Sequence, residues 1–298
     1  MEGYVATIGF FDGVHCGHRC LIGQVKDLAA RFGMRSMVVT FDRHPRQVLC
    51  SDYQPRLLSS LSEKMAMLHE CGVDRVELLQ FTKSLSSLTA FEFMCDVLKG
   101  RLGVKVLLMG YDHKFGHGGG TFPEYVEWGR EVGVEVRLAS ELEGVKVSSS
   151  KARRLVEEGR IDEANVLLGH PFMIEGQVTE GHHVGREIGY PTANLTTDSD
   201  MLLPPVGVYA VQVLFGDGSL YGGMLCIGDR PTLENGDDIS VEVNIFDFEG
   251  DLYGSMLRLR VLSKIRDEEK FPGVEQLKEQ LRSDEQSVRR LLSCSHDK

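Results

Sequence analysis

The sequence predicts two domains: an α/β domain built on a doubly wound parallel sheet, and then a small antiparallel β-barrel followed by a C-terminal helix. The first observation is an alternation of short apolar strands with amphipathic helices through the N-terminal half. The second is a change after His170 to runs rich in Val, Ile, Tyr and Phe, separated by turn signals. The length of 298 residues suits two domains of ordinary size.

The N-terminal half alternates predicted strands with predicted helices. An apolar helical spacing runs through residues 19–32 and closes at Gly33, a residue type that ends helices readily. Three Ser/Thr-x-x-Glu capping boxes predict helices that begin near Ser60, Thr89 and Thr121. The predicted strands span residues 5–9, 36–41, 73–81, 104–109 and 134–138. Because strands joined by helices form parallel sheets, we expect ligands beyond their carboxyl ends.

The second half is predicted to be an antiparallel barrel. Turn signals at 216–218 and 249–251 separate runs of β-branched and aromatic residues. Two short helices are predicted within 150–169, and we divide the chain into domains 1–168 and 169–298. The predicted elements are strands near 171–180, 206–215, 219–227, 240–248 and 253–265, and a charged helix over 274–292.

Composition and charge disfavour several classes of function. The formal net charge of -11 argues against non-specific nucleic-acid binding. No apolar run reaches membrane-spanning length, and no signal-peptide pattern opens the chain, so we expect a cytoplasmic protein without membrane association. The seven cysteines form no CxxC pair and are expected to be reduced thiols. We therefore expect small-molecule partners, and the oligomeric state is left open.

One candidate site follows the first strand, in the segment GFFDGVHCGHR over residues 9–19. Gly17 allows a phosphate to approach the backbone, and the helix that follows offers free N–H groups. The imidazoles of His15 and His18 can donate hydrogen bonds to phosphate oxygens, as phosphoryl or nucleotidyl transfer requires. The alternative is a pair of accidental or structural histidines. The position between a first strand and an amphipathic helix favours the functional interpretation.

Two further segments are candidates for the same site. Ser148, Ser149 and Ser150 precede a predicted helix with Arg153 one turn inside it, so hydroxyls, helix N-terminus and guanidinium can together bind an anion. The alternative is an ordinary N-cap with a solvated arginine. The glycine-rich loop 110–116 follows the apolar strand 104–109 at the same edge of the sheet. The alternative interpretation of this segment is an ordinary glycine-rich loop without a ligand.

The N-terminal domain resembles the FMN adenylyltransferase domain, a nucleotidyltransferase, of bacterial bifunctional FAD synthetases. The resemblance covers residues 4–168, and its motifs are GFFDGVHCGH, TFDRHP at 40–45, GYDHKFG and SSSKAR. The residues that it implies for the ATP phosphates are His15, His18, Ser148, Ser149 and Arg153. It places Asp112 near flavin and ATP, and it places a flavin pocket near Phe41 and Pro45. Phe10 and His113 differ from the family's usual Asn and aromatic residue.

A second candidate site lies in the segment GQVTEGHHVGREIGYPTANL, residues 176–195. Its glycines make a flexible loop that carries Arg186. Thr192 and Asn194 are two residues apart and share one face of an extended segment, where their oxygens suit Mg²⁺ between protein and nucleotide phosphates. On a later strand, Glu242 can accept a proton from an alcohol as a general base. The alternative for the PTAN segment is an ordinary loop with a proline turn. The alternative for Glu242 is an exposed glutamate on an amphipathic strand.

The C-terminal domain resembles the riboflavin kinase domain, a small β-barrel, of the same enzymes. The resemblance covers residues 170–298, with the runs GREIGYPTANL, IGDRPT at 227–232, VEVNIFDFEGDLYG at 241–254 and KIRDEEKFPGVEQLKEQL at 264–281. It implies that Glu242 is the base acting on the ribityl 5′-hydroxyl and that Thr192 and Asn194 serve Mg²⁺ and ATP. It also implies that Arg186 lies in a loop over the nucleotide and that Arg230 contacts flavin.

Together the resemblances imply an enzyme that makes FMN and then FAD. The C-terminal domain would convert riboflavin and ATP to FMN and ADP, and the N-terminal domain would convert FMN and ATP to FAD and pyrophosphate. Mg²⁺ is expected at both sites to neutralise phosphate charge. Two alternatives stay open: a kinase whose N-terminal domain is silent, which Phe10 and His113 suggest, and a flavin-sensing or flavin-carrying protein. Glu242 beside an intact PTAN argues against a sensor, which needs no base.

Overall fold

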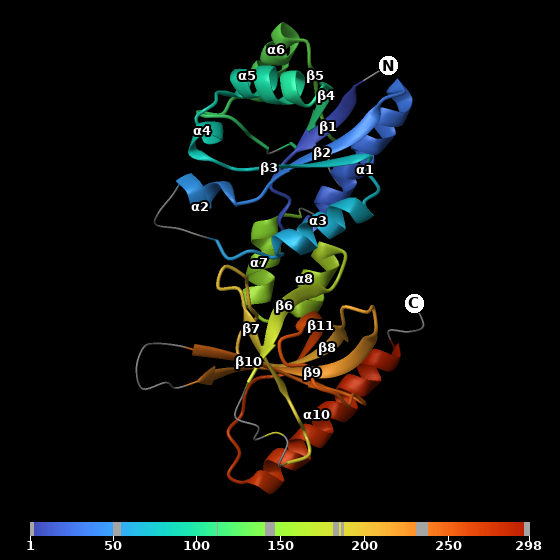
Figure 1. Cartoon of the computed structure of the whole chain (residues 1–298), viewed down its shortest axis with the longest axis vertical. Helices are drawn as coiled ribbons and strands as arrows, with labels where there is room; N and C mark the ends of the chain where they lie inside the picture. Colours follow the sequence, from blue (N-terminus) through green and yellow to red (C-terminus); the bar gives the residue numbers. More distant parts are fainter. Residues whose placement is uncertain are drawn as a thin grey trace. The chain divides into compact units, whose positions relative to one another are not determined.

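The computed structural model describes residues 3–49, 55–111, 113–140, 147–180, 185, 188–230 and 238–294. The chain divides into two compact units, Met1–Ser148 and Ser149–Lys298. Figure 1 shows a sheet with helices in the first unit and a barrel with a long terminal helix in the second. The predicted fold class is confirmed.

The sheet of the first unit is parallel throughout. Its strands are β1 (Tyr4–Ile8), β2 (Arg35–Phe41), β3 (Arg75–Leu79), β4 (Val104–Met109) and β5 (Glu135–Leu138). Their order is β3-β2-β1-β4-β5, so the chain moves outward from β1 on one side and then crosses to the other at β4. The loops after β1 and β4 therefore diverge at a switch point, where sheets of this kind bind ligands.

Helical segments connect these strands. They are η1 (Asp12–Val14), α1 (Cys16–Phe32), α2 (Pro45–Leu49), α3 (Leu61–Glu70), α4 (Lys83–Ser86), α5 (Ala90–Glu92), the π-helical η2 (Phe93–Arg101) and α6 (Phe122–Val132). The predicted capping boxes at Ser60, Thr89 and Thr121 all form. Helix α1 begins at Cys16 rather than at Arg19, because the His15 side chain caps its first turn.

Both faces of the sheet are covered by helices. On one face Tyr4, Ala6 and Ile8 pack with residues of η2 and α6. On the other face Val5 packs with Val25 of α1, and α3 lies against α1 on that face. Burial on both faces explains why these strands are near-continuous apolar runs rather than alternating ones.

The second unit is a closed antiparallel barrel with the strand order β10-β7-β6-β11-β8-β9. Its elements are α7 (Ser149–Glu157), α8 (Ile161–Leu168), β6 (Phe172–Thr179), β7 (Ala193–Thr197), β8 (Gly207–Leu214), β9 (Leu220–Arg230), β10 (Asp238–Ile245), β11 (Met256–Arg266) and α10 (Val274–Cys294). Strand β7 is not predicted from the sequence, because only Leu195 of its five residues is buried. Helix α10 packs on the barrel through Val288, which is fully buried.

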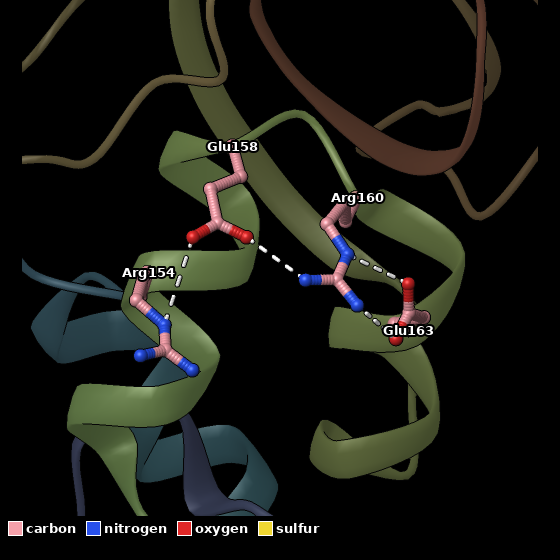
Figure 2. A network of polar contacts seen from close by, with 4 residues as sticks. All are labelled: Arg154, Glu158, Arg160 and Glu163. Atoms are coloured by element: carbon pink, nitrogen blue, oxygen red, sulfur yellow. Dashed lines mark hydrogen bonds and ion pairs between the residues drawn. The ribbon is translucent and has the colours of Figure 1, made fainter.

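An ion-pair network marks the turn between α7 and α8. Figure 2 shows Arg160 between the carboxylates of Glu158 and Glu163. The N–O distances of these ion pairs are 3.0 Å to Glu158 and 2.6 Å to Glu163. Arg154 adds a longer ion pair to Glu158 at 3.7 Å. Since these side chains are largely exposed, the ion pairs contribute little to stability. The two helices depend instead on buried apolar residues such as Leu155.

Candidate active sites

The turn after β1 has a strained backbone that the segment before α3 supports. Val14 has a φ of 36°, which is rare for a β-branched residue. The buried Asp12 carboxylate accepts a hydrogen bond from Leu58 N at 3.0 Å. The N–H of Gly13 donates to Ser59 Oγ at 3.1 Å. These two bonds tie the turn to the segment before α3.

His15 and His18 stack on each other at the N-terminus of α1. Their ring centroids are 3.5 Å apart and their planes meet at 15°. The backbone N–H of His18 donates to His15 Nδ1 at 3.2 Å, so the ring N–H of His15 is on Nε2. A Cβ at Gly17 would lie 3.2 Å from the His15 ring, which is tighter than an ordinary contact. Glycine therefore leaves room for the stacked pair.

His18 is uncharged at neutral pH. Burial lowers its pKa well below the usual 6.5, and the charges of His15 and His113 lower the pKa further. Its Nδ1 is buried and makes no hydrogen bond to any residue that the structure describes. Such an atom costs free energy unless a ligand or water binds it, so it is a candidate to contact substrate. The effect of His113 also shows that the loops after β1 and β4 approach each other.

The serine motif lies at the start of α7. Arg153 is one turn inside that helix, as predicted, and the helix begins at Ser149, one residue earlier than the predicted range of 150–169. Ser148, Ser149 and Arg153 are all partly exposed. Ser149 and Arg153 belong to the second compact unit, whereas the two histidines belong to the first. We predict that these residues and the histidines act on the same phosphate groups, and this stays a prediction.

A cavity of about 450 Å³ lies at the carboxyl ends of β1 and β2. Its aromatic lining consists of Phe10, Phe41, Phe81, Phe93 and Phe115. Its basic lining consists of His44, Arg46, His113, Lys114 and His117. Phe41 and Pro45, the two predicted flavin contacts in this domain, both line it. Aromatic walls suit a planar ring system, and basic groups suit the phosphate that FMN carries.

The barrel brings Glu242 and the PTAN residues together. Glu242 lies opposite Asn194 in the pairing of β10 with β7, and Thr192 Oγ1 donates to Glu242 Oε2 at 3.1 Å. The buried Asn244 donates from Nδ2 to Pro191 O at 2.7 Å, which fixes the turn before Thr192. Residues far apart in the sequence thus form one polar cluster.

Two cavities meet at this cluster. The first, of about 580 Å³, is lined by Glu242 and by apolar and aromatic residues that include Phe271. The second, of about 710 Å³, is lined by Asn194 and by residues 248–253. Thr192 lines both. The arrangement can hold an alcohol in one cavity and a phosphate donor in the other, with a carboxylate beside the place where they meet.

The terminal helix connects the walls of the two cavities. Arg289 binds both oxygens of the Asp247 carboxylate, at 2.8 and 2.9 Å, and its Nε donates to Glu285 at 2.8 Å. The hydroxyl of Tyr190 donates to the same glutamate at 3.2 Å. Tyr190 lines the smaller cavity, and Asp247 directly precedes the segment that lines the larger one. Sequence reasoning does not identify Arg289, because its pairing with Asp247 depends on the fold.

Two family models match the chain. A model described as FAD synthetase matches residues 1–151, and one described as riboflavin kinase matches residues 168–292. The chain belongs to the bifunctional riboflavin kinase/FMN adenylyltransferase family. It has the FAD synthetase domain first and the riboflavin kinase domain second.

Relatives match over nearly the whole length. The bifunctional riboflavin kinase/FMN adenylyltransferase of Bacillus subtilis (strain 168) is 36% identical over 296 residues, which cover 97% of this chain and 92% of that protein. That of Escherichia coli (strain K12) is 38% identical over 297 residues, covering 99% and 94%. A crystal structure described as a macrolide-efflux protein from Streptococcus pneumoniae matches with a TM-score of 0.85 at 34% identity, covering 96% and 94%. Within the described ranges, no helix of this chain combines the length and apolarity needed to cross a membrane.

Three predicted site residues cannot be placed. Asp112 and Arg186 lie outside the described residues, and only the backbone of Arg230 is described, as the last residue of β9. In the part of the chain that the structure describes, no group of three or more His, Cys, Asp or Glu side chains could hold a metal. In the riboflavin kinase domain, Thr192 Oγ1 nonetheless lies 3.1 Å from Glu242 Oε2, and Asn194 lies opposite Glu242 in the pairing of β7 with β10. This donor set fits Mg²⁺, which prefers oxygen ligands and keeps several waters and phosphate oxygens.

Proposed function

We propose that the riboflavin kinase domain transfers the γ-phosphoryl group of ATP to the ribityl 5′-hydroxyl of riboflavin. The observation that carries this assignment is the hydrogen bond between Thr192 and Glu242 where the two cavities meet. The smaller, more apolar cavity would take the flavin, with Arg230 as a further contact. The larger one would take the nucleotide, with Arg186 in the loop over its phosphates.

The chemistry at this site needs one proton acceptor and well-placed positive charge. Glu242 accepts the proton of the 5′-hydroxyl while that oxygen bonds to the γ-phosphorus and the bond to the β,γ-bridging oxygen breaks, releasing ADP. The Thr192 hydroxyl orients the carboxylate. When bound, Mg²⁺ supplies neutralisation of the phosphate charge, and Thr192 and Asn194 would hold it.

We propose that the FAD synthetase domain then transfers the adenylyl group of a second ATP to FMN. An FMN phosphate oxygen bonds to the α-phosphorus, and pyrophosphate leaves. His15, through its Nε2–H, and the neutral His18 donate hydrogen bonds to phosphate oxygens at the positive end of α1. Gly17 leaves room for the backbone approach. The further residues proposed for this site are Asp112, Ser148, Ser149 and Arg153 for ATP, and Phe41 and Pro45 for flavin.

The domain division and the cellular context are also proposals. We propose domains 1–168 and 169–298, a division supported by the family models, which leave residues 152–167 between them. The proposed partners are riboflavin, FMN and ATP, without nucleic acid or membrane, in the cytoplasm. The net charge of -11 supports the proposal that nucleic acid is not a partner, because non-specific binding to nucleic acid needs positive charge.

Removal of divalent cations is expected to stop both reactions, because phosphate charge would then oppose each nucleophile. Chromatography of FMN and FAD after treatment with a chelator, and again after excess Mg²⁺ is added, measures this. Thr192→Val, which keeps the shape of the side chain, should raise the Mg²⁺ concentration needed for FMN formation but leave that for FAD formation unchanged. An unchanged Mg²⁺ requirement in both reactions would remove Thr192 from the metal site.

A further inference from the structure

Lys64 is a buried cation behind the flavin cavity of the N-terminal domain. It lies in the middle of α3 and is only 2% exposed, although lysine is among the residues least often buried. Its Nζ donates to Phe41 O at 2.7 Å and lies 3.7 Å from the centroid of the Phe10 ring. Phe10 and Phe41 both line the 450 Å³ cavity. The ammonium therefore contacts two parts of the cavity wall from behind.

Two carboxylates act on the same ammonium. They belong to Asp12 in η1 and to Asp42 directly after β2, and among the described residues they are the charged groups that raise the pKa of Lys64. Asp12 also accepts from Leu58 N and so holds the turn that leads to His15. Asp42 also accepts from the N–H of Phe81, another residue of the cavity wall, at 2.8 Å. The ammonium thus contacts the cavity wall at Phe10 and Phe41 and also feels the charge of Asp12 in the turn that leads to His15.

Stability alone does not account for a charge in this position. A buried charge is weak evidence for a purely structural role, because replacing both partners of a buried ion pair by apolar residues of similar volume is often neutral or stabilising. Burial is the larger influence and lowers the pKa of Lys64 from 10.5 to about 8. The side chain is therefore a cation at neutral pH and becomes neutral as the pH rises through about 8.

We propose that Lys64 is a positioning residue for adenylyl transfer, whose ammonium holds the Phe10 ring and the Phe41 carbonyl in register with the turn that carries His15. This inference rests on the proposed function of the N-terminal domain. The residue acts through the cavity wall and the turn, and it does not touch the reacting atoms. Its loss moves the flavin relative to the ATP phosphates, and misplacement on the ångström scale costs about 10²-fold in rate.

The test compares Lys64→Met with Lys105→Met, which removes an exposed lysine of β4 in the same unit. Lys64→Met should lower kcat/KM for FMN in FAD formation by about 10- to 100-fold and leave riboflavin phosphorylation unchanged. Lys105→Met should leave both reactions unchanged. Wild-type FAD formation should decline as the pH rises through about 8, and this decline should be absent in Lys64→Met.

Folding stability should respond to pH in the opposite direction. The folded-state pKa of Lys64 is below its unfolded value, so the unfolded chain binds more protons between about 8 and 10.5. The contribution of Lys64 to stability therefore rises with pH over this window, while its contribution to activity falls. Lys64→Met should lack both trends. If raising the pH lowered both the activity and the stability of wild type, and did the same in Lys64→Met, the proposal would be overturned.

Quenching of FMN fluorescence separates failure of this inference from failure of the proposed function. If wild type makes no FAD, the proposed function fails, yet FMN binding should still weaken in Lys64→Met and weaken above pH 8 in wild type. If Lys64→Met does not fold, Phe10→Leu, which removes the ring beside the ammonium, should show the weaker FMN binding. Wild-type FMN binding that is constant from pH 7 to 9, or equal binding by Lys64→Met, would overturn the proposal.

Discussion

Glu242→Gln is expected to lower the rate of riboflavin phosphorylation by about 10²–10⁴-fold, the range that a general base contributes. The amide keeps the size of the carboxylate and can still accept the hydrogen bond from Thr192, so the barrel should fold. It cannot accept the proton of the 5′-hydroxyl. Conversion of added FMN to FAD should continue at the wild-type rate, because Glu242 lies in the other compact unit from the two histidines.

The matched control is Glu175→Gln in the same barrel. Glu175 binds Arg258 at 3.0 Å and does not line either cavity of the riboflavin kinase domain. This substitution should leave FMN formation unchanged. A Glu242→Gln protein that phosphorylates riboflavin normally would show that another group, or water, accepts the proton.

His18→Ala is expected to lower FAD formation by about 10²–10³-fold, which is the usual loss when one preorganised donor is removed from a site of developing charge. It also removes the ring that stacks on His15. The pKa of His18 is well below its usual value. Protonation of this side chain should therefore not lower the rate of FAD formation as the pH falls through 6.5. Riboflavin phosphorylation should be unaffected.

The control for His18→Ala is His69→Ala, which removes an exposed histidine near the end of α3. Both activities should survive that change. Loss of both activities in His18→Ala, with an unchanged melting temperature, would mean that the two sites are not assigned to the correct domains.

Local patterns predict most of the fold. The three capping boxes and the apolar strands of the parallel sheet are visible because each depends on neighbouring residues. Strand β7 is not predicted because only Leu195 of its residues is buried, so the strand has no apolar pattern of its own. Its ladder partners in β10 and β6 are distant in the sequence. The π-helical turn of η2 has no distinct signal either, since its residues suit an α-helix equally well.

The sites are predicted less completely than the fold. Thr192 and Glu242 are joined by a hydrogen bond, and Phe41 and Pro45 line one cavity. The roles of these residues remain proposals. Lys64 and Arg289 are not identified from the sequence, because lysine and arginine at helical spacing suggest solvated faces. Lys64 is instead buried and donates to Phe41 O, whereas Arg289 does lie on an exposed face and its pairing with Asp247 depends on the fold.

The most direct test of this account is a chromatographic time course that starts from riboflavin, ATP, Mg²⁺ and purified protein. FMN should appear first and then decline as FAD forms, because the product of the barrel site is the substrate of the N-terminal site. FMN that accumulates without FAD would contradict the adenylyl-transfer site and indicate a silent N-terminal domain. If neither product formed while flavin still bound, both sites would be contradicted and a flavin-carrying protein would be the better description.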